Sequence, residues 1–247
     1  MNVSSNSQSM ERTQTSRAKY DHAHWEKQRR FLRFLLRTLA FSMLVKLEHV
    51  EGLENISEHG PAVLLMNHIA FVDPIVVMHV VPRNIVPMAK IEVYNYPVIG
   101  IFPRLWGVIP VRREEVDRRA VQSALEVLHA GEILLVAPEG TRNPQLQRGK
   151  EGMAYLASRS GAPIVPVAIF GTSGFPALRF SQRWIEPGAC LRFGRPFYYR
   201  PELRRASREQ LRQMADEAMY ILAAMLPPQL RGVYSDLAGA TQETIHW

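Results

Sequence analysis

The chain has 247 residues and a formal net charge of +7. Its hydrophobic fraction of 47% and charged fraction of 21% exclude a disordered chain, a collagen-like chain and a polytopic membrane protein. The single cysteine, Cys190, excludes a disulfide framework and a cysteine-based zinc site and favours a reducing compartment. The excess of Lys and Arg indicates an anionic partner, which composition leaves open between nucleic acid, a phosphorylated substrate and an anionic membrane.

The N-terminal region divides into two segments. Residues 1–30 are polar, lack the apolar core of a signal peptide and are expected to be flexible. Residues 31–47 contain the most apolar helical stretch, but it is too short and too charged for a membrane-spanning helix, which needs about 20 apolar residues. Because Arg30, Arg33 and Arg37 recur at helical spacing, we expect an amphipathic helix that lies in a membrane interface. The alternative is a helix that packs on the domain core.

Residues 48–226 are predicted to form one α/β domain, with a mixed, partly parallel central sheet flanked by helices. Short apolar runs alternate there with amphipathic stretches of helical length. A long helix over 207–225 is ended by Pro227 and Pro228, and residues 227–247 form a C-terminal tail without a predicted structure. The other expected helices are 74–80, 115–130 and 151–160, and the expected strands are 62–66, 85–88, 108–111, 133–137, 164–170 and 190–193.

Several common motifs are absent from the sequence. It contains no glycine-rich nucleotide-binding motif, no Gly-x-Ser-x-Gly nucleophile motif and no His-Glu-x-x-His zinc motif. The basic residues are scattered and are not interleaved with aromatic residues. Nucleic acid is therefore not expected as a partner.

A histidine and an aspartate flank a predicted turn after the first strand of the domain, in Asn67-His68-Ile-Ala-Phe-Val-Asp73-Pro74. Their spacing separates them on a continuous helix and puts them on opposite faces of a continuous strand. They can meet if the chain turns, with Asp73 as the N-cap of a helix that starts at Pro74. A carboxylate bonded to one ring nitrogen then makes the other nitrogen a better base. The alternative is a plain N-cap beside an incidental histidine.

Two further predicted strands end in charged residues. One is followed by Pro138-Glu139-Gly140-Thr141-Arg142, and the other is Gly107-Val-Ile-Pro-Val-Arg112-Arg113. Proteins of the α/β class bind ligands beyond the carboxyl ends of their strands. Gly140 allows close approach of the backbone, and Arg142 can grip a phosphate with two hydrogen bonds. Each segment alone is equally consistent with a solvated turn, but together they are expected to converge with His68 at one edge of the sheet.

These blocks, followed by Val165-Pro-Val-Ala-Ile169, resemble in order and spacing the PlsC-like glycerolipid acyltransferases, whose best-known members act on lysophosphatidic acid. The resemblance covers about residues 60–175, and Lys150 with Gly152 is similar to the family's Lys-x-Gly. Three residues depart from the usual pattern: Arg112 replaces a frequent Asp, Ala137 a frequent Phe, and Asn143 a frequent Ser.

The resemblance implies transfer of a fatty acyl group from a thioester, acyl-CoA or acyl carrier protein, to the free hydroxyl of lysophosphatidic acid. The product would be phosphatidic acid. By the same resemblance His68 is the general base and Asp73 the carboxylate that orients it. Because a thioester is already activated, no metal or cofactor is expected. The residues implied in substrate binding are Arg112, Arg113, Glu139, Gly140, Thr141, Arg142 and Lys150.

The implied lipid acceptor favours a peripheral or monotopic location on the cytoplasmic face of an anionic membrane. Other acceptors remain open at this point: glycerol-3-phosphate, another lysophospholipid or a lyso-aminolipid. Two functions of other classes are a catalytically silent membrane scaffold and a thioester hydrolase in which water replaces the acceptor.

Overall fold

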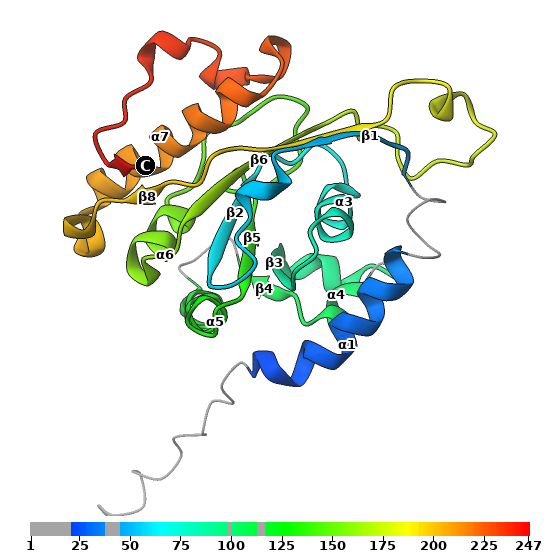
Figure 1. The fold of residues 1–247 in the computed structure, drawn as a ribbon, viewed down its shortest axis with the longest axis horizontal. Helices are drawn as coiled ribbons and strands as arrows, with labels where there is room; N and C mark the ends of the chain where they lie inside the picture. The colour runs from blue at the N-terminus through cyan, green and yellow to red at the C-terminus, as the bar shows by residue number, and fades with distance from the viewer. Residues whose placement is uncertain (1–20, 38–44, 98–99, 113–116) are drawn as a thin grey trace, which may run out of the picture.

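A computed structural model describes residues 21–37, 45–97, 100–112 and 117–247. Within them, a seven-stranded sheet has the order β1–β7–β6–β2–β5–β3–β4 (Figure 1). The five strands from β6 to β4 are parallel, while β7 is antiparallel to β6 and β1 is parallel to β7. The predicted mixed, partly parallel sheet is therefore confirmed. The strands are β1 (Leu47–Glu51), β2 (Ala62–Met66), β3 (Ile85–Lys90), β4 (Ile109–Val111), β5 (Ile133–Val136), β6 (Ile164–Phe170) and β7 (Ala189–Phe193).

Helices cover both faces of this sheet, as Figure 1 shows. The central strand β2 is buried along its whole length, because successive side chains point alternately into two apolar cores. Val63 and Leu65 join the core under α5, α6 and α7, whereas Leu64 and Met66 join the core under α3 and α4. The helices are α1 (His22–Leu35), α3 (Asp73–Val80), α4 (Ile101–Trp106), α5 (Arg118–His129), α6 (Gly152–Ser160) and α7 (Arg208–Met225).

The first helix differs from its predicted position and surroundings. α1 begins at His22, capped by Asp21, and residue 47 already belongs to β1. The end of the predicted helix, over 38–44, lies outside the described residues. Arg33 and Arg37 donate to backbone carbonyls at or just after the end of α3, including His79 O at 3.1 Å from Arg37, so both guanidinium groups contact the domain. None of the helices in the described ranges is long and apolar enough to cross a membrane.

α1 is nevertheless built into the domain. The fully buried guanidinium of Arg29 donates to the carbonyls of Trp106 and Gly107 at the end of α4, at 2.7 and 3.0 Å. The opposite side of the helix exposes Phe31 and Phe34, each about 60% accessible. The helix therefore packs on the core, as the alternative interpretation expects, and still presents aromatic side chains outward.

The C-terminal segment, left without a predicted structure, packs against α7. Glu217 of that helix accepts hydrogen bonds from Thr241, from the amide of Glu243 and from both the amide and the hydroxyl of Thr244. The last strand, β9 (Ile245–His246), pairs with β8 (Tyr198–Tyr199). The segment is held by hydrogen bonds to one buried carboxylate and by isolated buried side chains such as Tyr234 and Ile245, which form no periodic pattern in the sequence.

Replacing Gly107 with alanine is expected to destabilise the domain by more than the ordinary cost of a left-handed residue. Gly107 ends α4 at φ +66°, and a Cβ there would lie 2.5 Å from the indole of Trp25 in α1. The left-handed conformation costs about 1–2 kcal/mol for an alanine, and the overlap adds about 1–3 kcal/mol. Urea denaturation measures the sum.

Gly161→Ala is the matched control for this substitution. Gly161 also ends a helix, α6, in the left-handed region, but its Cβ would meet only Arg204 Nη2 at 3.8 Å. In a Trp25→Ala background, Gly107→Ala should cost no more than Gly161→Ala costs in the native chain. If both substitutions lowered the free energy of unfolding of the native chain equally, the Trp25 side chain of α1 would not lie in contact with this turn.

Candidate active site

His68 and Asp73 face each other beyond the end of the central strand. β2 ends at Met66, and the turn before α3 brings His68 Nδ1 to 3.0 Å from Asp73 Oδ2. The Asp73 side chain is fully buried, whereas 20% of the His68 side chain is exposed. Because the carboxylate holds Nδ1, the second ring nitrogen, Nε2, is the one available to take a proton from a bound molecule.

The carboxylate of Asp73 organises the turn itself. Its Oδ2 also accepts hydrogen bonds from the amides of Ile69 and Ala70, at 2.6 and 2.8 Å. The predicted N-cap role is wrong, because Val72 occupies the N-cap position and Asp73 is the first residue of α3. Three donors from the preceding turn draw the carboxylate backward, away from the helix amides that an N-cap would bind.

Neighbouring strands hold the backbone around His68 on both sides. The buried carboxylate of Glu139, after β5, accepts from the His68 amide at 3.1 Å and from the Gln147 amide at 2.9 Å. The backbone N–H of Asn143, in the same loop, donates to the His68 carbonyl at 2.8 Å. On the other side, the Asn67 side chain makes two 2.8 Å hydrogen bonds with the backbone of Ile169 in β6. The imidazole is therefore carried by a turn that three adjacent strands fix.

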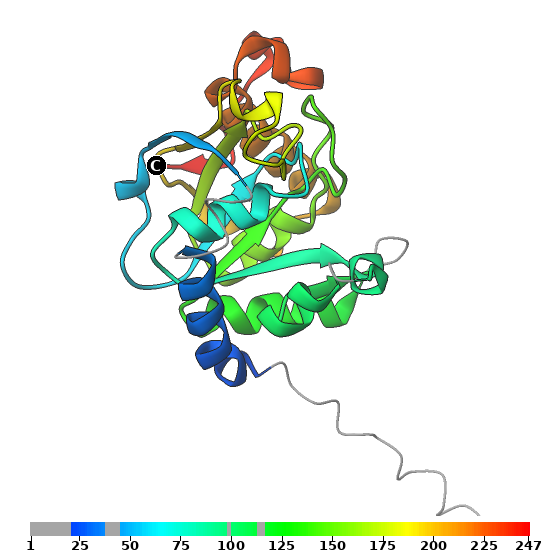
Figure 2. The ribbon, with the colours of Figure 1, turned by 90° about the vertical axis from the view of Figure 1, so that its right-hand side faces the viewer.

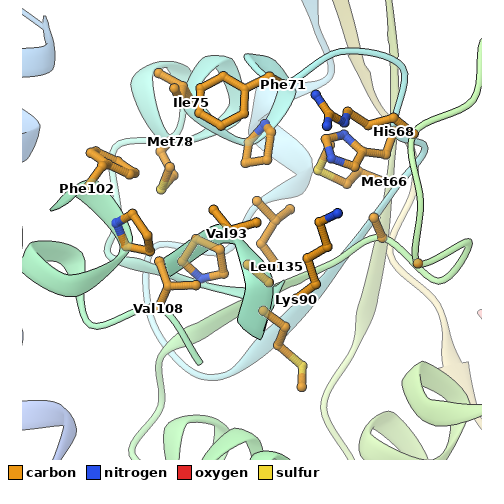
Figure 3. A pocket seen from close by; sticks show the side chains of 18 of the residues that line it. Met66, His68, Phe71, Ile75, Met78, Lys90, Val93, Phe102, Val108 and Leu135 are labelled. Carbon is orange, nitrogen blue, oxygen red and sulfur yellow. The ribbon is translucent and has the colours of Figure 1, made fainter. Parts of the chain in front are cut away.

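An apolar cavity of about 180 Å³ opens beside the imidazole. Figure 3 shows His68 at one end of it and Phe102 with Val108 at the other. The side chains between them come from β2, α3, β3, β5 and the segment after β3. An alkyl chain bound in the cavity would contact apolar side chains along its whole length. The labelled apolar lining is Met66, Phe71, Ile75, Met78, Val93, Phe102, Val108 and Leu135.

Two cationic side chains, Arg142 and Lys90, belong to the cavity lining. Gly140, Thr141 and Arg142, from the loop after β5, form part of the lining. Lys90, the last residue of β3, also lines the cavity and extends toward His68 in Figure 3. The site therefore combines a carboxylate-held imidazole, an apolar cavity and two cations that suit an anionic group.

Comparisons with known proteins agree with this geometry. The acyltransferase family profile matches residues 48–170. The curated 1-acyl-sn-glycerol-3-phosphate acyltransferase of Borreliella burgdorferi is 31% identical over 134 residues, 51% of this chain and 52% of that protein. The protein of the same name from Bacillus subtilis is 31% identical over 121 residues, 49% of this chain and 61% of that protein.

A solved structure gives the same result at the level of the fold. It is the 1-acyl-sn-glycerophosphate acyltransferase PlsC of Thermotoga maritima, which aligns with a TM-score of 0.57 and 26% identity over 78% of each chain. The chain belongs to the PlsC-like acyltransferase family. It spans between about a third and three fifths of the length of the first curated relatives that it matches.

The remaining predicted site residues of this PlsC-like chain lie around the cavity or outside the described ranges. Arg112 is exposed at the end of β4 and is not part of the cavity lining. Arg113 is outside the described residues. Lys150 packs against Gly140, with its Nζ 3.4 Å from the position of an added Cβ. Both oxygens of Glu139 accept hydrogen bonds from backbone amides, so this side chain links the His68 turn to the loop after β5.

Because of Glu139, we expect the stability of the PlsC-like domain to depend on pH. Burial raises its pKa to about 7, and the charge of Asp73 adds to this, although the amides of Gln147 and His68 oppose it. The native chain then keeps a proton that the unfolded chain releases near pH 4.5. This stabilisation is complete below about pH 4.5 and is lost as the pH rises through about 7, and it is on the order of 3 kcal/mol.

Urea denaturation across that pH range checks the expectation with two variants. Glu139→Gln removes the titrating group, so its unfolding free energy should gain on the native chain as the pH rises. Glu58→Gln, at an exposed position, is the control and should follow the native chain at every pH. A difference between Glu139→Gln and the native chain that does not change with pH would contradict the assignment.

Proposed function

We propose that this protein transfers a fatty acyl group from a thioester, acyl-CoA or acyl carrier protein, to the free hydroxyl of lysophosphatidic acid. The product is phosphatidic acid. The observation that carries the proposal is the position of His68, braced by a buried carboxylate at the mouth of an apolar cavity and beside cationic side chains.

In the proposed reaction, the acceptor hydroxyl is the nucleophile and His68 is the general base. Nε2 takes the hydroxyl proton as the oxygen bonds to the thioester carbonyl carbon. The buried carboxylate of Asp73 stabilises the imidazolium that forms. The carbon–sulfur bond then breaks, and the imidazolium returns the proton to the departing thiolate. The products are an ester and a free thiol, with no change in oxidation state.

The cavity and the cationic side chains would bind different parts of the two substrates. The apolar lining between His68 and Phe102 suits the hydrocarbon chain of the acyl group, whose carbonyl would then lie near the imidazole. Arg142 and Lys90 suit the phosphate of the acceptor. The curated relatives are named for the same acceptor, 1-acyl-sn-glycerol-3-phosphate. Sequence reasoning missed Lys90, and we include it among the proposed phosphate-binding residues.

We further propose a peripheral or monotopic location on the cytoplasmic face of a membrane. A lipid acceptor and a lipid product both reside in the bilayer, so the site must work beside it. Phe31 and Phe34, exposed on α1, provide aromatic side chains of the kind that enter a membrane interface.

A panel of acceptors tests the proposed function. The purified protein is given acyl-CoA or acyl carrier protein with lysophosphatidic acid, glycerol-3-phosphate, other lysophospholipids, a lyso-aminolipid or no acceptor, and free thiol and acylated product are both measured. Equal release of thiol and formation of phosphatidic acid is the expected result. Thiol release without acylated product would indicate a hydrolase, and no turnover with any acceptor would indicate a silent scaffold.

A further inference from the structure

The loop at residues 171–188, between β6 and β7, is held together by its own side chains. Arg183 donates to the carbonyls of Gly171, Ser173 and Pro187 and lies 4.1 Å above the ring of Phe175. Trp184 packs edge-on against the same ring, 5.6 Å away between centroids. These contacts bind both ends of the loop to its middle, so its outward surface has a defined shape.

That outward surface is strongly apolar. Leu178, Phe180 and Ile185 are 66%, 88% and 83% exposed, whereas Phe175 is buried. The aromatic contacts of the loop are thus on its inner side, and three large apolar side chains remain exposed to water. Side chains of this size gain about 1.5–3 kcal/mol each when they are fully buried, so they favour an apolar partner.

The charge of the loop indicates which apolar partner it fits. The loop carries two arginines and one glutamate, so its formal charge is positive: Arg183 pairs with Glu186 at 3.4 Å, and the Arg179 guanidinium lies over the Trp184 ring, 5.6 Å from its centroid. Arg179 stands between the exposed Leu178 and Phe180. A cation flanked by exposed apolar side chains matches an anionic bilayer surface, where phosphates lie directly above the acyl chains.

The loop also lies on the side of the molecule that the site requires. It leaves β6 just after Ile169, whose backbone holds Asn67 next to His68. Figure 2 faces this side and shows the yellow loop above α3, with α1 below, and Figure 1 gives the same vertical order. Along the vertical axis that the two views share, α3, which directly follows the catalytic turn, thus lies between the loop and α1.

We propose that the 171–188 loop inserts Leu178, Phe180 and Ile185 into the interface of an anionic bilayer, as a second membrane contact besides α1. The inference rests on the proposed function, because a bilayer-resident acceptor is what brings this side of the protein to a membrane. Contacts on both sides of α3 would hold the mouth of the site against the lipid surface.

Vesicle sedimentation tests the proposal without using catalysis. The full chain is mixed with phosphatidylcholine vesicles that contain or lack phosphatidylglycerol. Replacing Leu178, Phe180 and Ile185 together with serine should reduce partitioning onto the anionic vesicles by about tenfold or more. The single variant Leu178→Ser should also reduce it, whereas Val233→Ser, at a comparably exposed position in the C-terminal segment, should not.

A second measurement reports contact directly. In a Cys190→Ala background, an environment-sensitive fluorophore on Phe180→Cys should shift to shorter emission wavelengths when anionic vesicles are added. The same label on Val233→Cys should not shift. No shift at residue 180, or unchanged partitioning of the triple serine variant, would overturn the proposal. The proposal would also be overturned if light scattering showed a dimer for the native chain and a monomer for the triple serine variant while both bound vesicles equally. The loop would then bind a second copy of the chain.

Activity assays separate this inference from the proposed function. The triple serine variant should retain turnover with a water-soluble, short-chain lysophosphatidic acid and lose it with acceptor embedded in vesicles. If the native chain acylates no acceptor at all, the proposed function fails, while the sedimentation and fluorescence results still decide whether the loop binds lipid.

Discussion

Replacing His68 with alanine is expected to reduce kcat by about 10²- to 10⁴-fold, the usual contribution of a positioned general base. Asp73→Asn should also reduce kcat severely, because the amide removes the charge that stabilises the imidazolium. It can still accept hydrogen bonds from Ile69 and Ala70, so the turn should survive. Steady-state kinetics with an acyl thioester and lysophosphatidic acid measure both effects.

The controls for this prediction distinguish loss of chemistry from loss of the fold. His129→Ala changes an exposed histidine at the end of α5 and should leave kcat unchanged. Circular dichroism should show an intact fold for all three variants, and KM should change much less than kcat for His68→Ala. A near-normal kcat for His68→Ala would refute the assignment of the base.

Arg142→Lys is expected to lower kcat/KM for lysophosphatidic acid by about 10- to over 100-fold, although it keeps the charge. A bidentate guanidinium contact to phosphate cannot be reproduced by the single ammonium group of lysine. Charge-assisted hydrogen bonds of this type are worth about 1.5–3 kcal/mol, which corresponds to the expected loss. The measurement compares initial rates with lysophosphatidic acid and with a neutral monoacylglycerol.

The loss should be confined to the acceptor that carries a phosphate. Arg148→Lys provides the matched control, because Arg148 is exposed on the same loop and does not line the cavity. It should leave both rates unchanged. If Arg142→Lys reduced the two rates equally, Arg142 would support the loop or bind the donor, and the preference for a phosphate-bearing acceptor would lose its main support.

Much of the sheet could be predicted from the sequence because its strands are short, continuous apolar runs. Ala62–Met66 and Ile164–Phe170 agree with the structure at both ends, and the helix predicted over 207–225 is α7, one residue shorter because Ser207 is its N-cap. β1 was missed because its side chains are mostly exposed and polar, so no apolar run marks it. α4 was missed because six residues are too few to show helical periodicity.

The site was predictable where local sequence determines it. The meeting of His68 with Asp73 follows from a turn of a few residues, and the structure contains the contact. Lys90 could not be found in this way, because the apolar run of β3 ends before it and its place in the cavity lining depends on how segments far apart in the chain pack together. The cavity lining was also out of reach, since it is assembled from segments far apart in the chain.

Arg29 has a practical consequence for anyone who wants a freely soluble form of this protein. Deleting the N-terminal helix as a removable anchor would uncover Trp106, which is fully buried, and would leave two carbonyls at the end of α4 without their guanidinium donor. The wall of the cavity at Phe102 belongs to the same short helix. Polar replacements at Phe31 and Phe34 leave that joint untouched, and they are the changes to make first.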